Sequence, residues 1–220
     1  GLAGLAAAYD LARAGKPVTV LESEPSFGGL AGAFRLEGIP VERYYHFLCR
    51  SDRHVLTLAA ELGLTPRWRS THTAFFYRGR HYPFGHPGDL LRFSPVPFVQ
   101  RVRFGWNILR SYYRRHWQWL DELPARAWLI EDIGEEAYRV IWQPLLQVKF
   151  GAVHTRISAA WMWHRIWRVA QSRASLLSRE QFGCFDAGSE SLIDALVQWL
   201  RAQPHVSLRA GAPALEVLTG

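Results

Sequence analysis

The feature that most constrains the fold is a pair of glycines placed just before a helix and a strand. The chain opens GLAGLAAAYDLARAG, with Gly1 and Gly4 leading into small residues, and then passes through Lys16-Pro17 into the apolar run VTVLE. A tight turn into a helix of small side chains leaves the first N–H groups accessible, and their partial positive charge favours an anion. Gly15 is expected to end the helix, because glycine adopts the left-handed conformation after a helix end.

The strand that follows ends in Glu22. Dinucleotide-binding folds place an acidic residue about 20 positions after their glycines, where it binds the ribose hydroxyls. The complete fingerprint is G-x-G-x-x-G after a strand, whereas this chain supplies only G-x-x-G. We therefore expect a fragment that lacks its first strand and first glycine. Two alternatives remain: a plain packing role for the small-residue helix, and a solvated strand end for Glu22.

A second glycine pair, Gly28-Gly29, follows in the segment SEPSFGGLAGAF. It would let another stretch of backbone pass beside a pyrophosphate, although an ordinary turn also explains a lone glycine pair. The glycine helix, the strand, the acidic residue and this pair together resemble the FAD-binding start of the amine oxidase and protoporphyrinogen oxidase-like flavoproteins. Phytoene desaturases and UDP-galactopyranose mutases share that start.

The resemblance implies FAD as the cofactor and gives each of these residues a place beside it. Gly1 and Gly4 would lie at the pyrophosphate, Glu22 on the adenosine ribose, and Gly28-Gly29 beside the phosphates. Many amine oxidases have an arginine after the glycine pair, whereas this chain continues Leu-Ala-Gly, so one charge contact to the cofactor is absent. The sequence GGLAGAF is closer to those of the protoporphyrinogen oxidase-like and mutase-like branches than to those of true amine oxidases.

Two further positions are assigned only through the resemblance. His46 matches a histidine near the flavin ring in the mutases and some oxidases, where an ordinary pKa near ~6.5 suits proton exchange. The alternative is a histidine packed among Tyr44 and Tyr45. Ala214 falls where a small residue contacts the adenine, although valine is more usual there. Gly188 stands where two glycines are commoner.

The predicted fold class is α/β, with a discontinuous and incomplete Rossmann-like FAD-binding domain and an inserted, mainly helical substrate domain. The FAD-binding domain would comprise residues 1–65 and 181–220, and the substrate domain residues 66–180. The local predictions are a hairpin turn at Glu37-Gly38, a helix over 51–62 capped by Ser51, helices broken at Gly134 and closed by Gln143-Pro144 and Gly151, and a helix over 192–201 capped by Ser189 or Ser191.

An arginine-rich segment lies between Asp89 and Asp121, with six arginines and no acidic residue. Apolar residues recur there at steps of three or four, which predicts a helix over about 99–120 with one apolar face and one basic face. These residues are Val102, Trp106, Leu109, Tyr113, Trp117 and Leu120. Such a helix could meet anionic lipid or gather a lipophilic or acidic substrate, or it could be a core helix with solvated arginines. No nucleic-acid motif accompanies it, so we expect no nucleic-acid partner.

Composition bounds the remaining possibilities. With 220 residues, 49% of them hydrophobic, the chain can bury a substantial core, and its net charge is +7. It has no apolar run of about 18 residues and no charged-then-apolar leader, so neither a membrane span nor a signal peptide is expected. Cys49 and Cys184 lack metal or redox spacing. We expect no metal, and a cytoplasmic location with a peripheral contact to the inner face of the membrane as the alternative.

The resemblance to these flavoproteins implies an oxidoreductase that transfers a hydride from an organic small molecule to FAD, although the fragment alone is expected to be inactive. The substrate would be lipophilic or a nucleotide sugar. One alternative is a redox-neutral isomerase of the UDP-galactopyranose mutase type, in which the arginines would hold the diphosphate. A second is a non-catalytic, membrane-associated flavin-binding protein that uses the arginine-rich helix.

Overall fold

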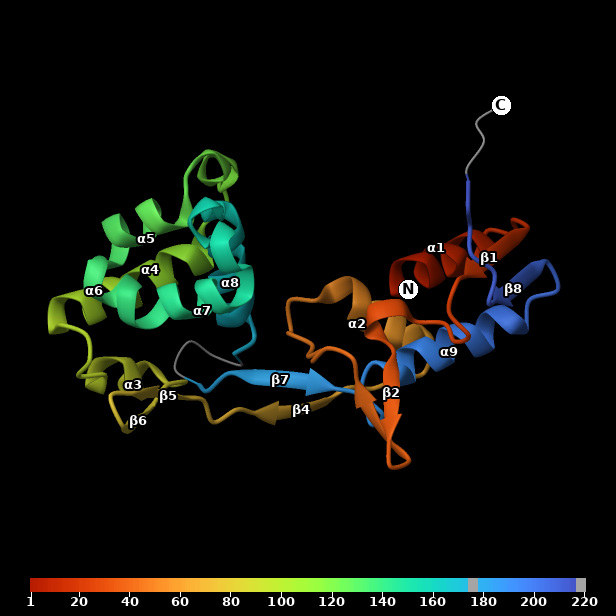
Figure 1. Ribbon diagram of the computed structural model, residues 1–220, viewed down its shortest axis with the longest axis horizontal. Coiled ribbons are helices and arrows are strands. Elements are labelled where there is room, and N and C mark those ends of the chain that lie inside the picture. Colours follow the sequence, from red (N-terminus) through yellow and green to blue (C-terminus); the bar gives the residue numbers. More distant parts are fainter. Residues whose placement is uncertain (174–177, 217–220) are drawn as a thin grey trace. The chain divides into compact units, whose positions relative to one another are not determined.

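The computed structural model describes residues 1–173 and 178–216 and divides the chain into two compact units. Unit 1 comprises Gly1–Leu48, Asp52–Trp68 and the chain from Gly183 onward. Unit 2 comprises Cys49–Ser51 and Arg69–Phe182. Both helices and strands occur in the chain, and Figure 1 shows their order along the sequence.

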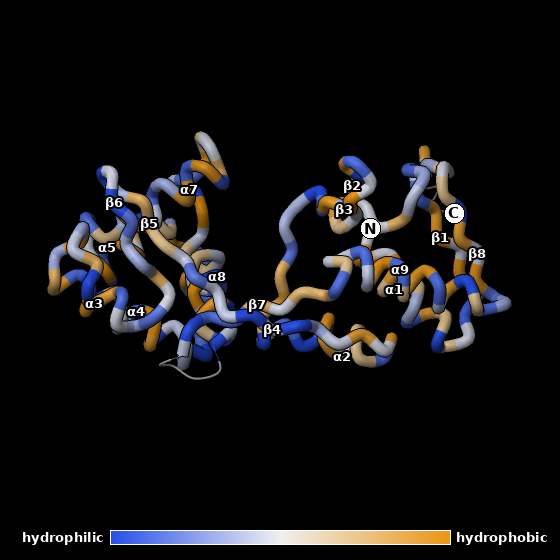
Figure 2. The backbone as a smooth tube through the Cα atoms, turned by 90° about the horizontal axis from the view of Figure 1, so that it is seen from below, coloured by the Kyte–Doolittle hydropathy of each residue, from blue (hydrophilic) through white to orange (hydrophobic). Residues whose placement is uncertain are grey.

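Unit 1 is built around two helices and a parallel strand pair. Its first elements are α1 (Leu2–Arg13) and β1 (Val18–Glu22), and its last are α9 (Glu190–Arg201) and β8 (Val206–Ala210). The strands β1 and β8 pair in parallel. Helices α1 and α9 pack against each other through buried apolar side chains, among them Leu5 and Leu196. The tube in Figure 2 is orange along much of both strands, where their hydrophobic residues lie.

Helix α1 ends as the sequence predicts. Gly15 has a φ of +71°, and its N–H donates to the Ala12 carbonyl at 2.9 Å. The next N–H, from Lys16, donates to the Leu11 carbonyl at 3.0 Å. This pair of bonds is the Schellman motif, which satisfies the last helical carbonyls and turns the chain toward β1.

The predicted hairpin is also present, but the cap of the following helix was predicted wrongly. Strands β2 (Ala33–Leu36) and β3 (Ile39–Glu42) pair across a turn in which Glu37 and Gly38 both have positive φ. Helix α2 (Arg53–Glu61) has Asp52 at its N-cap position, not Ser51. The first helical bond runs from the Leu56 N–H to the Asp52 carbonyl, so the helix begins one residue later than a Ser51 cap would require.

Unit 2 is mainly helical and also contains the hairpin β5–β6. Strand β4 pairs with β7, and both strands lie where the chain passes from one unit to the other. The elements of unit 2, with β4 and β7 at the boundary, are β4 (Arg67–Ser70), β5 (Ala74–Tyr77), β6 (Arg80–Pro83), α3 (Pro87–Arg92), α4 (Phe98–Tyr113), η2 (Gln118–Glu122), α5 (Ala125–Ile133), α6 (Glu135–Ala137), η3 (Tyr138–Trp142), α7 (Gln143–Phe150), η4 (Gly151–Arg156), α8 (Ala159–Gln171) and β7 (Gln181–Cys184). Its core is formed by fully buried residues such as Leu129 and Met162.

Gly134 breaks the helical run as predicted, but Gln143-Pro144 does not close it. Gly134 has a φ of +94°, a conformation that separates α5 from α6. The helix then continues from Glu135 to Phe150 through the π-helical turn η3, and Pro144 lies in the first turn of α7. Proline is tolerated there because its missing N–H falls where the hydrogen-bonding pattern changes. The run ends at Gly151, whose φ is +54°.

The arginine-rich helix is shorter than predicted, and its buried face is a different one. Helix α4 ends at Tyr113, after which Arg114 is extended. Of the predicted apolar face, Val102, Trp106 and Tyr113 are exposed. The buried residues of α4 are instead Phe104, Asn107 and Ser111.

Side chains of other helices bond to two residues on the buried side of α4. The Asn107 Nδ2 donates to Asp132 Oδ2 of α5 at 2.7 Å. The Trp163 Nε1 of α8 donates to the Ser111 carbonyl at 3.1 Å. These bonds offset part of the cost of burying polar groups, although Asn107 Oδ1 and the Ser111 hydroxyl have no hydrogen-bond partner among the described residues. Phe104 joins the core of unit 2 on the same side of the helix, whereas the aromatic stripe stays outside.

We expect Gly134→Ala to lower the free energy of unfolding by about 2 kcal/mol or more. Its φ of +94° with ψ of 155° is a conformation open essentially to glycine alone, at a cost of ~1–3 kcal/mol for other residues. The new Cβ would also lie 2.5 Å from the Cδ of Gln100, whose Oε1 accepts from the Ala137 N–H. The control Gly63→Ala, at φ +75° with no atom within 4 Å, should lose less. Equal losses in urea unfolding would contradict this account.

Candidate functional site

The start of α1 presents an open surface of main chain. Gly1 occupies the N-cap position, and the first helical bond runs from the Leu5 N–H to the Gly1 carbonyl at 3.2 Å. The N–H groups of residues 2–4 precede that bond and have no acceptor within the helix. Leu5 is buried toward α9, whereas Gly1 and Gly4 are exposed. No atom outside the helix backbone lies within 4 Å of the position a Gly4 Cβ would take.

The second glycine pair lies directly beside this helix start. A Cβ at Gly29 would lie 3.1 Å from the Gly1 Cα, and Gly29 has a φ of +58°. A Cβ at Gly28, whose φ is +125°, would lie 2.7 Å from the Cδ1 of Ile193 on α9. Both positions favour glycine, because their φ is positive and because a side chain there would force its neighbours to shift. The structure thus brings Gly1, Gly28 and Gly29 together as two adjoining stretches of bare backbone.

Glu22 completes this group from the end of β1. Its Oε2 lies 3.6 Å from the Gly1 nitrogen, and only 12% of its side chain is exposed. Its Oε1 accepts from the Glu24 N–H at 3.2 Å. That N–H is the largest cause that lowers the pKa of Glu22 below its usual value, against an opposing effect of burial. The side chain is therefore an ionised acceptor at neutral pH, held next to the helix start.

The other two predicted site residues, Ala214 and His46, are less directly connected to the glycines and Glu22. Ala214 is exposed and follows β8. Two residues before it, the Ala212 N–H donates to the Glu22 carbonyl at 2.8 Å, so this segment runs along the end of β1. His46 is exposed in the loop after β3. Within the described residues, no hydrogen bond connects the His46 ring to the glycines or to Glu22.

Glu42 is a residue of this region that the sequence analysis missed. Its Oε1 accepts from the Ser189 N–H at 2.7 Å and lies 2.8 Å from the Ser189 hydroxyl, and its Oε2 accepts from the His46 N–H at 3.2 Å. Burial alone would raise the pKa of Glu42, but these donors together lower it below its usual value.

The Glu42 carboxylate holds three segments of unit 1 together: the end of β3, the loop that carries His46, and the start of α9. Sequence gives no signal for it, because its main partner lies 147 positions away. The capping role predicted for Ser189 is wrong. That serine stands at the N-cap position of α9, but its side chain makes no capping bond. Its hydroxyl lies 2.6 Å from the Ala31 carbonyl, in the loop that follows the glycine pair.

Together, these residues suit a phosphate-bearing dinucleotide. The helix N–H groups can bind phosphate oxygens, the glycines allow close approach, and the Glu22 carboxylate can accept hydroxyl protons of a ribose. The model for flavin-containing amine oxidoreductases matches residues 2–220. The chain belongs to this family. FAD is accordingly the cofactor of the protein, and the bare backbone at Gly1 and Gly29 fits its pyrophosphate.

Individual relatives agree with the family assignment. The chain is 38% identical over 112 residues to a Mycobacterium tuberculosis protein named "Putative flavin-containing monoamine oxidase AofH". The matched segment covers 50% of this chain and 24% of that protein. The chain is similar in fold to a solved structure named "Putative protoporphyrinogen oxidase from Exiguobacterium sp. 255-15", with a TM-score of 0.65 and 20% identity over 98% of this chain and 51% of the other. Reduced UDP-galactopyranose mutase matches with a TM-score of 0.62 and 18% identity, over 93% and 46%. The chain spans about half the length of these solved structures.

Two other kinds of feature are absent from residues 1–173 and 178–216. No group of three or more histidine, cysteine, aspartate or glutamate side chains could hold a metal ion there. None of the helices in these ranges has the length and apolar character needed to cross a membrane.

We expect the contribution of Glu22 to stability to depend on pH in acid. Because its folded pKa lies below the unfolded value, the ionised carboxylate stabilises the fold above about pH 4.3, and this contribution is lost as pH falls through the folded pKa. Glu22→Gln should thus be less stable than the wild type by a constant amount from about pH 5.5 to 8, with the gap closing in stronger acid. Urea unfolding at several pH values measures it, with Glu24→Gln as the exposed neighbouring control. A gap that persists unchanged in acid would contradict the prediction.

Proposed function

We propose that the protein is a FAD-dependent oxidoreductase that oxidises an organic small molecule. The observation that carries the proposal is the contact of Gly29 with Gly1, which leaves the start of α1 open beside the Glu22 carboxylate. In this proposal unit 1 is a Rossmann-like FAD-binding domain, supported by the parallel pairing of β1 with β8 and by α1 and α9. The mainly helical unit 2 is then the inserted substrate domain.

Each predicted residue has a separate task in this function. The first N–H groups of α1 and the backbone at Gly28-Gly29 would bind the pyrophosphate, and Glu22 would bind the adenosine ribose. Ala214 would contact the adenine. When bound, FAD supplies a hydride acceptor for the oxidation of the substrate. His46 is the candidate for proton exchange, which would take place at an imidazole nitrogen. The bond from the His46 main-chain N–H to Glu42 would fix the loop that carries this residue.

The redox-neutral alternative has less support from the structure. A nucleotide-sugar isomerase would need free cations for the diphosphate, and we expected the arginines of residues 99–120 to supply them. Arg103 Nε instead donates to the Asp132 carbonyl at 3.0 Å, Arg101 donates to the Leu91 carbonyl, and Arg110 lies 3.4 Å from Asp132 Oδ1. These contacts engage three of the six arginines in the arginine-rich segment, and to that extent they favour oxidation over isomerisation. Conversion of UDP-galactopyranose by the reduced protein without net electron transfer would establish the alternative.

Gly4→Ala tests the cofactor site without damaging the fold. A methyl group there meets no atom, so it should raise the free energy of unfolding by about 0.5–1 kcal/mol through helix propensity. It should also weaken FAD binding about tenfold, because it separates the pyrophosphate from the helix N–H groups. Flavin fluorescence titration of the apoprotein measures the affinity.

The control for Gly4→Ala is Ala7→Val, at an exposed position one turn further along α1. This variant should bind FAD as the wild type does, because its added methyl groups lie away from the helix start. If Gly4→Ala also binds FAD with unchanged affinity, the cofactor does not lie at the start of α1.

We also propose that the protein is cytoplasmic and contacts the membrane surface peripherally through the outer face of α4. Phe98, Val102, Trp106 and Tyr113 are exposed on this helix. Aromatic and aliphatic side chains on one helix face are typical of segments that bury their apolar face in the headgroup region. Because Arg101, Arg103 and Arg110 are bonded within the protein, apolar insertion would dominate over attraction to anionic lipid.

Flotation with vesicles tests this contact. The protein should float with both neutral and anionic vesicles, with little dependence on salt, and Trp106→Ser should weaken binding about tenfold. The control Phe76→Ser removes an equally exposed aromatic ring from β5, outside α4. Failure to float, or an equal effect of the two substitutions, would rule out the α4 contact.

A further inference from the structure

Unit 2 contains an apolar cavity of about 330 Å³ that includes none of the predicted flavin-site residues. It lies among the segment before α3, α3 itself, α4 and α8. Its apolar wall, among the described residues, consists of Phe84, Pro87, Leu90, Phe104, Ile108 and Leu109. A volume of this size with a mainly apolar lining is characteristic of sites for small organic molecules.

Small residues create the hollow. Gly85, Gly105 and Ala170 line it from three different segments. Gly105 lies inside α4, where glycine weakens a helix relative to alanine. A Cβ at this position would lie 3.6 Å from the Leu90 Cδ2, which is ordinary contact, so packing alone does not require glycine there. The glycine instead keeps space open between α4 and α3.

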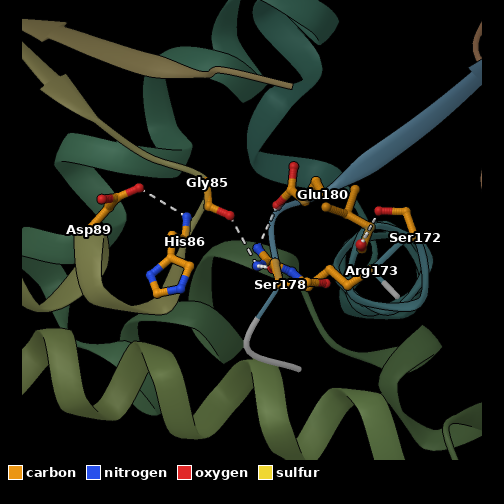
Figure 3. Close-up of polar contacts among 8 residues, drawn as sticks. Gly85, His86, Asp89, Ser172, Arg173, Ser178 and Glu180 are labelled. Carbon is orange, nitrogen blue, oxygen red and sulfur yellow. Dashed lines mark hydrogen bonds and ion pairs between the residues drawn. The ribbon is translucent and has the colours of Figure 1, made fainter. Parts of the chain in front are cut away.

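Two polar side chains border the cavity, and their existing bonds decide what they can offer. The His86 Nδ1 accepts from the Gly88 N–H at 3.0 Å, so the proton of the neutral ring is on Nε2, which is a donor. Arg173 already makes three polar contacts: it donates to the Gly85 carbonyl at 3.0 Å and the Ser178 carbonyl at 2.7 Å, and it pairs with Glu180 Oε1 at 2.8 Å. Figure 3 shows His86 and Arg173 on either side of Gly85.

We propose that this cavity binds a neutral hydrophobic molecule of about two fused rings that carries one hydrogen-bond acceptor. The volume is roughly twice that of an apolar cavity that holds benzene, ~150 Å³. His86 Nε2–H would donate to the acceptor. An anionic ligand is disfavoured, because the Arg173 charge is compensated by Glu180 and a second buried anion would lack a partner.

The probe for this site is 2-acetylnaphthalene, titrated into the flavin-loaded protein and followed by its fluorescence. We expect saturable binding at one site per chain. Naphthalene, which lacks the acceptor, should bind about three- to tenfold more weakly, and 2-naphthoate should bind more weakly than both. No saturable binding of 2-acetylnaphthalene, or tighter binding of 2-naphthoate, would overturn the proposal.

Two variants of the cavity test separately whether binding needs the open space and whether it needs the hydrogen bond. Gly105→Leu fills the hollow while favouring the helix, and it should weaken binding of both neutral probes at least about tenfold. His86→Asp keeps a side-chain acceptor for the N-cap of α3 and, as a carboxylate, has no N–H to donate. It should therefore reduce the affinity for 2-acetylnaphthalene to that for naphthalene, and leave naphthalene binding unchanged.

The controls keep the result interpretable. Ala60→Leu places the same side chain at an exposed position of α2 and should leave probe binding unchanged. Circular dichroism establishes that each variant is folded, and Ala170→Leu replaces Gly105→Leu if the latter is not. Unchanged probe affinity in a folded filling variant would overturn the proposal. Flavin content, measured by absorbance, reports on the cofactor site independently.

Discussion

The contact between the main chains of Gly1 and Gly29 is the constraint on which the candidate site depends. A side chain at Gly29 would push the loop away from α1, since its Cβ would come within 3.1 Å of the Gly1 Cα. Ile193 of α9 packs over Gly28 on the other side. The loop therefore fits between the helix start and α9 because Gly28 and Gly29 have no side chains. This bare backbone is also what a pyrophosphate needs in order to approach the helix N–H groups.

Local signals were sufficient for the turns and for the group of residues at the start of α1. Gly15, Gly38 and Gly134 stand where the chain needs positive φ, a requirement that each position imposes by itself. Glu22 was predictable because its spacing from the glycines follows from the length of one helix and one strand. Glu42 was not predictable, because its carboxylate is held by Ser189, which only the fold brings near.

Helix α4 illustrates where periodicity fails. Val102, Trp106 and Tyr113 form an apolar stripe in the sequence, yet the helix buries Asn107 and Ser111 instead. Asp132 and Trp163 bond to the buried side of α4 from other helices. A hydrophobic pattern predicts that a helix has two unlike faces, but the face that is buried here is the one where Phe104 joins the core of unit 2 and where other helices bond to Asn107 and to the Ser111 carbonyl.

The central claim is that FAD binds across the start of α1, with its pyrophosphate against the glycines and its ribose on Glu22. A crystal structure of the protein with FAD bound tests it most directly. The account predicts pyrophosphate oxygens within hydrogen-bonding distance of the main-chain N–H groups in the first turn of α1, and a ribose hydroxyl donating to a Glu22 carboxylate oxygen. A pyrophosphate bound elsewhere, or Glu22 without contact to the ribose, would contradict it.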